Sequence, residues 1–361
     1  MLMALFLFGG QELAKEANVD HQVFIRTTEE RHRIAVDHVW RELQAKGFIY
    51  KSSYAGWYAV SDEAYYSETQ VMESVDKGGK KEMVSIETGT KVEWMEEENY
   101  KFRLSAFREK LIEWLSGEPN VLQPPSRTTT LLASLTPLNS PDLQDLSISR
   151  PSSRLSWGIR VPDDPDHTIY VWIDALVNYL TAAGYPWKGG EAFEEGQVWP
   201  PDLMVVGKDI IRFHTLYLPA VLMALELPLP KNILAHGHWT MDKFKMSKSR
   251  GNVANPFEAM KTWGVDSMRC YLMRNGGNSG NDSDYSATEV ERVYKKELAG
   301  QLGNLLSRVS NPKLLSKLAS PELLYTTPSS IDAQDLELFT TLDTLAGTLS
   351  HPALLLSGFL H

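Results

Sequence analysis

Between residues 168 and 235 short apolar runs alternate with longer amphipathic runs, and this alternation constrains the fold more than any other feature. We expect three strands and two helices there: strands at 168–173, 203–206 and 232–235, and helices at 175–183 and 211–225. Strands that alternate with helices of this length form units whose strands pair in parallel and whose helices cover the sheet. The sequence therefore predicts an α/β fold.

The run Lys245-Met246-Ser247-Lys248-Ser249 places two ammonium groups and two hydroxyl groups on one short segment. Lysine binds phosphate oxygens as a compact point charge, and the nearby Gly251 lets the backbone bend close to a ligand. Displacement at a phosphate is catalysed mainly by positioning and by neutralising charge, so a cationic loop suits polyphosphate chemistry. For these five residues taken alone, a solvated basic turn is the alternative.

Four strings resemble, in order and approximate spacing, the methionyl-tRNA synthetase family of class I aminoacyl-tRNA synthetases. They are Tyr170-Val171-Trp172-Ile173-Asp174-Ala175 with Tyr179, the segment from Gly207 to His214, His236-Gly237-His238-Trp239, and the lysine run. An ordered set is far more specific than any single motif, and the resemblance covers most of the chain. It implies a ligase that uses ATP with Mg²⁺ to activate L-methionine and transfers the methionyl group to tRNA(Met).

The resemblance also implies a domain order. Four segments follow one another: an α+β connective insertion at 25–160, the second half of a Rossmann-like catalytic domain at 161–235, the lysine-loop and stem-contact region at 236–285, and the start of an α-helical anticodon-binding domain at 286–361. Residues 1–24 would be a remnant of the amino-terminal catalytic half, because the family's His-x-Gly-His motif is not found before Lys245. We therefore expect an incomplete class I catalytic domain whose activity is impaired.

The methionine pocket has a physical basis, since aromatic faces and a polar group that touches sulfur bind a thioether well. Trp172 and Tyr179 lie seven residues apart, so on a strand-to-helix turn both would face one cavity. Ala175 would keep its floor open, while Ile210 and His214, four apart on one helix face, would close it. Ordinary core packing, with His214 as a hydrogen-bonded core histidine, is the alternative.

By resemblance, Gly207 would permit close approach of the adenosine and Asp209 would bind its ribose, at a strand end where ligands collect in open α/β sheets. Asp209 as a helix cap is the alternative. Lys245, Ser247 and Lys248 would bind ATP, and the two lysines would neutralise charge that grows on the leaving pyrophosphate.

Arg150 lies in a segment that resembles one of the family's, which places an arginine toward the active site. Its guanidinium group can bind a carboxylate or a phosphate bidentately, so we count it among the catalytic candidates with Lys245 and Lys248. The alternative is an ordinary surface arginine.

Composition limits the cofactors and partners. The chain has 361 residues, 43% of them hydrophobic, which is enough for more than one domain. A formal charge of −10 means that any tRNA contact must come from local basic patches. The single Cys270 rules out a multi-cysteine zinc site, and His236 and His238 lack a third ligand nearby, so we expect no metal site and no structural zinc.

Local patterns predict further elements. Residues 26–46 read as a helix with a threonine cap that ends at Gly47, and its apolar positions are Ile34, Val36, Val39, Trp40 and Leu43. Two short strands are expected at 48–50 and 56–60, and a loop at 124–141. Helices are expected from residue 284 on, with a leucine stripe at Leu298, Leu302, Leu305 and Leu306 that indicates a buried face.

The location and the alternative functions follow from the same observations. A zinc-free insertion resembles mitochondrial and some bacterial members, so we expect a mitochondrial matrix protein, with the cytoplasm as the alternative, and a monomer. The apolar start at 1–8 is too short to span a bilayer, so no membrane association is expected. A catalytically inactive tRNA- or protein-binding fragment, and a nucleotidyl-transferase with another acid substrate, are the other functions considered.

Overall fold

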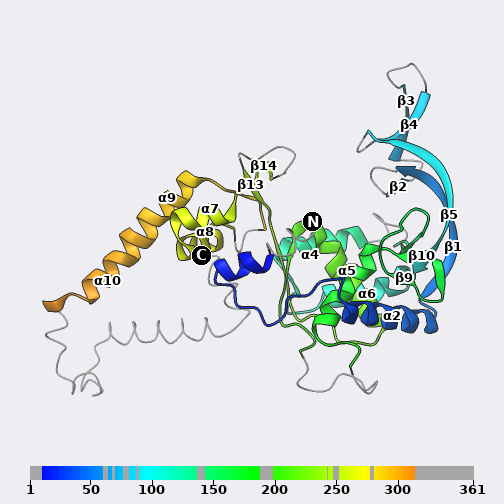
Figure 1. Cartoon of the computed structure of the whole chain (residues 1–361), viewed down its shortest axis with the longest axis horizontal. Coiled ribbons are helices and arrows are strands. Elements are labelled where there is room, and N and C mark those ends of the chain that lie inside the picture. The colour runs from blue at the N-terminus through cyan, green and yellow to red at the C-terminus, as the bar shows by residue number, and fades with distance from the viewer. Residues whose placement is uncertain are drawn as a thin grey trace. The chain divides into compact units, whose positions relative to one another are not determined.

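Ten segments are described by the computed structural model: residues 10–59, 64–66, 70–75, 81–86, 89–135, 143–187, 198–241, 243–246, 252–276 and 280–313. Contacts divide the chain into two units (Figure 1). Unit 1 combines Met1–Gln22 with His236–His361, and unit 2 is Val23–Ala235. The five-part domain order expected from the sequence stays a prediction.

In unit 2, helix α2 (Glu30–Ala45) buries one face made of Ala35, Val36, Val39, Trp40 and Leu43. The expected threonine cap is wrong, because Glu29 is the cap residue and no side chain caps the first turn. Ile34 is 53% exposed instead of buried. It shares a helix face with the polar residues Asp37 and His38, three and four positions further on, and that face is turned toward solvent. Gly47 ends the helix as predicted, with a φ of 76°.

The six-stranded sheet of unit 2 lies in the segment expected to be the insertion and is called the insertion sheet below. It is built on two long antiparallel strands, β1 (Ile49–Ala59) and β5 (Lys91–Phe102). The two short strands expected at 48–50 and 56–60 are therefore one. The remaining strands are β2 (Ala64–Tyr66), β3 (Val71–Val75), β4 (Lys81–Ser85) and β7 (Leu146–Ser147). Their order is β2-β1-β5-β4-β3, with β7 paired to β5. Figure 1 shows β1 and β5 as long curved strands that carry the shorter ones outward from α2.

The α/β part of unit 2 contains the sheet on which the candidate site depends. Its strand order is β11-β12-β6, and the strands are β11 (Met204–Gly207), β12 (Ile233–His236) and β6 (Leu122–Gln123). Strands β12 and β6 pair in parallel, although β6 was not among the strands expected from the sequence. The helical segment after β11 consists of three consecutive pieces: η3 (Lys208–Ile210), η4 (Phe213–Tyr217) and α6 (Leu218–Ala224).

The strand expected at 168–173 is wrong in its second half, and its expected place in the parallel sheet is wrong as well. Strand β10 (Asp164–Ile169) ends earlier and pairs antiparallel with β8 (Ser149–Pro151) and β9 (Arg160–Val161). Helix α5 (Val171–Ala182) begins two residues later. Its buried residues Ile173, Leu176, Val177 and Leu180 recur at helical spacing, so burial of this face decides against the strand preference of Val-Trp-Ile.

The loop expected at 124–141 is also wrong where it is described, because residues 125–135 form helix α4 (Pro125–Leu135). Thr128, Leu131 and Leu135 are buried along one face of it, and proline at the first helical position is compatible with a helix start. Residues 136–142 lie outside the described part. The preceding elements are η2 (Leu104–Phe107) and α3 (Arg108–Leu115).

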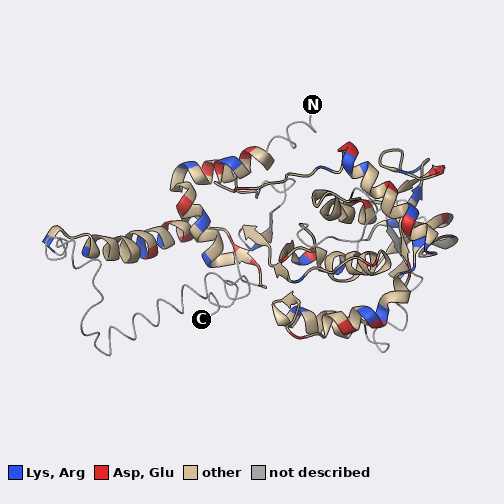
Figure 2. Ribbon diagram, turned by 90° about the horizontal axis from the view of Figure 1, so that it is seen from below, with Lys and Arg blue, Asp and Glu red and all other residues tan. Residues whose placement is uncertain are grey.

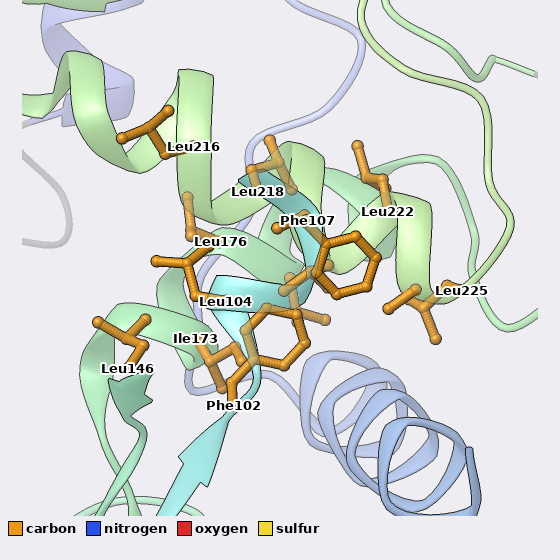
Figure 3. Packing of buried hydrophobic residues seen from close by; sticks show 14 of the residues in the cluster. Phe102, Leu104, Phe107, Leu146, Ile173, Leu176, Leu216, Leu218, Leu222 and Leu225 are labelled. Carbon is orange, nitrogen blue, oxygen red and sulfur yellow. The ribbon is translucent and has the colours of Figure 1, made fainter. Parts of the chain in front are cut away.

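The core of unit 2 joins the insertion strands to the site helices. Figure 3 shows Phe102, Leu104 and Phe107 packed among apolar residues of α5, η4 and α6. The rings of Phe102 and Phe107 stack with their centroids 5.8 Å apart. Because each fully buried large apolar side chain contributes about 1.5–3 kcal/mol, this cluster holds α5 beside η4.

In unit 1, a small sheet precedes a run of helices. Strand β13 (Trp239–Met241) pairs antiparallel with β14 (Phe244–Lys245) and parallel with β15 (Ser283–Asp284). The helices are α7 (Pro256–Trp263), α8 (Val265–Gly276), α9 (Ala287–Val293), η6 (Tyr294–Leu302) and α10 (Gly303–Val309). The helical prediction after 284 is confirmed as far as residue 313. The leucine stripe is not a buried face, since Leu302, Leu305 and Leu306 are 59%, 58% and 63% exposed.

Charges are mixed along the helices. Figure 2 shows basic and acidic residues side by side instead of a one-sided basic face. In unit 1, Arg292 pairs with Glu289, and Arg274 pairs with Glu297. Across the described segments, no helix combines the length and apolar character needed to cross a bilayer.

Candidate functional site

Trp172 lies in the first turn of α5 in a row of aromatic rings. Its ring is 5.3 Å from that of Tyr170, 5.5 Å from Phe213 and 6.0 Å from Tyr217, centroid to centroid. Phe213 and Tyr217 both belong to η4, a short stretch of wide π-helical turn that follows the tight 3₁₀ turn η3. Such widened turns recur at functional sites. Sequence reasoning selected Trp172 but missed Phe213 and Tyr217, although both lie in or beside the string that it used.

Tyr179 and His214 form a hydrogen-bonded pair between α5 and η4. The Tyr179 hydroxyl lies 2.8 Å from Nε2 of His214, and Nδ1 of His214 lies 2.8 Å from the carbonyl oxygen of Ile210. A carbonyl only accepts, so Nδ1 carries the proton, and the neutral ring accepts the tyrosine proton at Nε2. Burial lowers the pKa of His214 and raises the pKa of Tyr179, which favours these neutral forms.

The structure thus brings three of the five expected methionine residues to the contact of α5 with η4. Ala175, half-buried, lies one turn beyond Trp172 and one turn before Tyr179, so it shares their face. Ile210 contributes its carbonyl oxygen to His214, while its side chain is 41% exposed. The assignment of these residues to methionine stays a prediction.

Arg150 lies beside the same aromatic row. Its guanidinium carbon is 4.1 Å from the centre of the Tyr170 ring, and Nη1 donates to Oγ of Ser147 and to the carbonyl oxygen of Ser149. The side chain is only 7% exposed, so the alternative of a surface arginine is wrong. Its Nε is buried without a hydrogen-bond partner. A buried cation with a spare donor suits an anionic ligand group.

Gly207 and Asp209 lie where a strand passes into a helical turn. Strand β11 ends at Gly207, which is the cap residue of η3, and Asp209 is exposed in that turn. The alternative of Asp209 as the capping residue is therefore wrong. This strand end is the position at which open α/β sheets bind ligands.

The lysine loop is described only at its two ends. Residues 247–251 lie outside the described segments, so Ser247 and Lys248 do too, and of Lys245 only the backbone is described, paired with Thr240. On the near side, Oδ1 of Asp284 accepts from the Lys243 amide at 2.8 Å. On the far side, Asn255 caps α7 by accepting from the amide of Phe257 at 3.0 Å. Sequence reasoning missed both supporting residues.

Among the described residues, no group of three or more His, Cys, Asp and Glu is arranged to hold a metal ion. A surface hollow of about 420 Å³ on the insertion sheet contains Trp57 and Trp94. Both of its lysines are paired with carboxylates of the same lining, Lys81 with Glu73 at 2.7 Å and Lys91 with Glu93 at 2.8 Å, and we assign the hollow no role.

A sheet with candidate ligand residues at a strand end, followed in the chain by a lysine loop, is the arrangement of a class I aminoacyl-tRNA synthetase. The profile of the family "tRNA synthetases class I (M)" matches residues 9–310. The chain belongs to this family, so the resemblance inferred from the four strings is confirmed.

The curated relatives are named as methionine–tRNA ligases. The chain is 48% identical over 356 residues to the probable mitochondrial methionine–tRNA ligase of Neurospora crassa, covering 96% of this chain and 56% of that protein. It is 43% identical over 304 residues to the mitochondrial methionine–tRNA ligase of Homo sapiens, covering 84% of this chain and 50% of that protein. The chain therefore spans about half the length of these relatives.

A bacterial protein and a solved structure extend the comparison. The methionine–tRNA ligase of Listeria innocua is 42% identical, over 83% of this chain and 44% of that protein. The Mycobacterium tuberculosis methionyl-tRNA synthetase in complex with methionyl-adenylate has a TM-score of 0.74 and 38% identity, and covers 93% of this chain and 64% of that one. The class I fold is thereby shown, including the mixture of helices and strands expected from the sequence.

Proposed function

We propose that this chain carries the methionine- and ATP-binding part of a methionine–tRNA ligase, which activates L-methionine as methionyl-adenylate and transfers it to tRNA(Met). The main support is the contact between α5 and η4, where Trp172, Tyr179 and His214 come together. The similarity to a synthetase solved with methionyl-adenylate supports the same substrates.

In this proposal Trp172 and Tyr179 contact the thioether, and His214 holds the Tyr179 hydroxyl in place. Ala175 keeps the floor of the pocket open, and Ile210 covers its edge. The neutral pocket rejects a charged side chain, because an unpaired ion loses its hydration there without compensation.

Activation needs no protein nucleophile, since the carboxylate of methionine attacks the α-phosphate and pyrophosphate leaves. Lys245, Ser247 and Lys248 bind phosphate oxygens of ATP, which reaches the site with Mg²⁺. Gly207 admits the adenosine and Asp209 binds its ribose. Arg150 places its unpartnered Nε toward an anionic group of the substrates.

The mitochondrial names of several relatives support a mitochondrial matrix location for this chain. The bacterial relative keeps the cytoplasm as the alternative. We further propose that the protein acts as a monomer and uses no structural zinc.

Binding of L-methionine tests the proposal most directly. Equilibrium dialysis of the purified chain with radiolabelled L-methionine should show saturable binding that unlabelled leucine does not displace. Trp172→Ala should weaken binding at least tenfold, because it removes the aromatic wall. Trp157→Ala is the matched control, since that tryptophan is 64% exposed. Equal effects of the two substitutions, or displacement by leucine, would contradict the assignment of the pocket.

Catalysis is tested separately by methionine-dependent exchange of pyrophosphate into ATP. Lys248→Ala should abolish any exchange that the chain supports, while Lys261→Ala on α7 should leave it unchanged. Methionine binding without exchange would favour the second candidate function, a tRNA- or protein-binding role without catalysis. A gel-shift assay with tRNA(Met) then tests that role.

A further inference from the structure

His32 is a fully buried histidine that the proposed chemistry does not use. It lies on α2, in the insertion, and its side chain is 0% exposed. Both ring nitrogens have partners on α5: Nε2 lies 2.7 Å from Oδ1 of Asp174, and Nδ1 lies 3.0 Å from Oγ1 of Thr181. A single side chain of the insertion is therefore bonded to the first and the last turn of the helix that carries the pocket aromatics.

The two bonded positions lie on the face of α5 opposite to the pocket. Asp174 and Thr181 are seven residues apart, so they share one face of the helix, and Trp172 and Tyr179 share another by the same spacing. Asp174 follows Trp172 by two residues and Thr181 follows Tyr179 by two, which corresponds to a rotation of about 200° around the helix axis. Helix α5 is thus held from behind by His32 and presents its aromatic residues on the other side.

Apolar packing alone does not fix such a helix in rotation. Helices α2 and α5 are in contact and both bury apolar residues, among them Val36 and Val39 of α2 and Val177 and Leu180 of α5. Apolar burial is non-directional, so it tolerates a small rotation of a helix about its axis. Two hydrogen bonds from one rigid imidazole ring, separated by two helical turns, do not tolerate it. Burying this polar group costs free energy that a leucine would not cost, so its bonds favour specificity of placement over stability.

We propose that His32 is a positioning residue for the methionine pocket, which sets the rotation of α5 through Asp174 and Thr181 and so the placement of Trp172 and Tyr179. The identity of the ligand rests on the proposed function. The geometric claim, that His32 controls the contact between Tyr179 and His214, does not.

The experiment compares His32→Leu, which removes both bonds at similar volume, with His32→Gln, whose amide can still donate to Asp174. His38→Leu is the matched control, because His38 lies on the same helix with a half-exposed side chain. Methionine affinity of the whole chain should fall about tenfold in His32→Leu and recover partly in His32→Gln. It should be unchanged in His38→Leu, and urea unfolding in parallel verifies that each variant is folded.

A double-mutant cycle separates positioning from general destabilisation. If His32 acts through Tyr179, the affinity losses of His32→Leu and Tyr179→Phe should be less than additive. Full additivity, or a loss in His32→Leu that equals the loss in His38→Leu, would overturn the proposal.

A second readout needs no ligand. In the wild type, the ¹⁵N shifts of His214 should show a proton on Nδ1 and titration below the ordinary range of histidine. His32→Leu should move that titration toward the ordinary range, because displacing Tyr179 opens His214 to water and relieves the burial that lowers its pKa. If the wild type fails to bind methionine, the proposed function fails while this measurement still decides the role of His32: an unchanged His214 would refute it.

Discussion

Tyr179 and His214 should be energetically coupled, because the hydrogen bond between them is partly buried. Tyr179→Phe removes a hydroxyl that lies 2.8 Å from Nε2 of His214. The lost bond is worth about 0.5–1.5 kcal/mol, and a buried acceptor left without a partner costs about 1–3 kcal/mol. His214 is 4% exposed, but Tyr179 is half-buried, so water reaches part of the vacated position.

We therefore expect Tyr179→Phe to lower the free energy of unfolding by about 2 kcal/mol, within the range for a buried acceptor left without a partner. For a unit of this size the melting temperature should fall by roughly 5 °C. The measurement is urea unfolding at pH 8, where His214 is neutral in both states, followed by circular dichroism. Tyr217→Phe is the control, since that hydroxyl makes no hydrogen bond to the described residues.

The same reasoning predicts the behaviour of the double variant. When His214→Leu is added to Tyr179→Phe, the two losses should fall short of additivity by about 1 kcal/mol, because the second substitution removes a group that the first has already left unpaired. Additive losses, or a loss in Tyr179→Phe no larger than that in Tyr217→Phe, would refute the hydrogen-bonded geometry assigned to the pair.

Three further results are expected. Burial lowers the pKa of His214 in the folded chain, so the unfolded chain takes up this proton first as the pH falls through about 6.5. The free energy of unfolding should therefore decline below that pH. His214→Leu should flatten the decline when urea unfolding is compared between pH 5 and 8. Gly237→Ala should cost at least about 2 kcal/mol, because its Cβ would lie 1.9 Å from the carbonyl oxygen of Asn281. Gly47→Ala has open space around the new Cβ, so it should cost only the strain of its positive φ, about 1 kcal/mol, when both glycine variants are compared by thermal unfolding. Phe102→Ala should cost about 3–5 kcal/mol as a cavity in the core, whereas Met72→Ala, half-exposed, should cost little; equal urea midpoints would contradict the packing.

Several elements could be predicted because their signal is local. The buried face of α2 repeats at helical spacing, and glycine ends that helix where a positive φ is needed. Strands β11 and β12 were located for the same reason, as short apolar runs between turns. The lysine run and the other three strings identify the family, because residue type and order carry that information without a fold.

The wrong predictions share one physical cause. The secondary-structure preference of a short segment does not determine which of its residues are buried against distant parts of the chain. Val171, Trp172 and Ile173 favour a strand, yet they begin α5, because the buried residues of this helix pack against α2 and η4. The composition of the segment after Pro124 is typical of a loop, yet the segment forms α4, and three of its residues are buried along one face of that helix.

The family, the order of the motifs and the residue types available to the site follow from the order of the amino acids alone. Which of these residues meet depends on the packing of the chain: Tyr179 with His214, Trp172 with Phe213 and Tyr217, and Arg150 with Tyr170. The packing also places His32 behind α5, across 142 positions of sequence from Asp174. Periodicity reports which face of an element is apolar, whereas the neighbour of that face is set by the packing of the whole core, and this information is not present in any single segment.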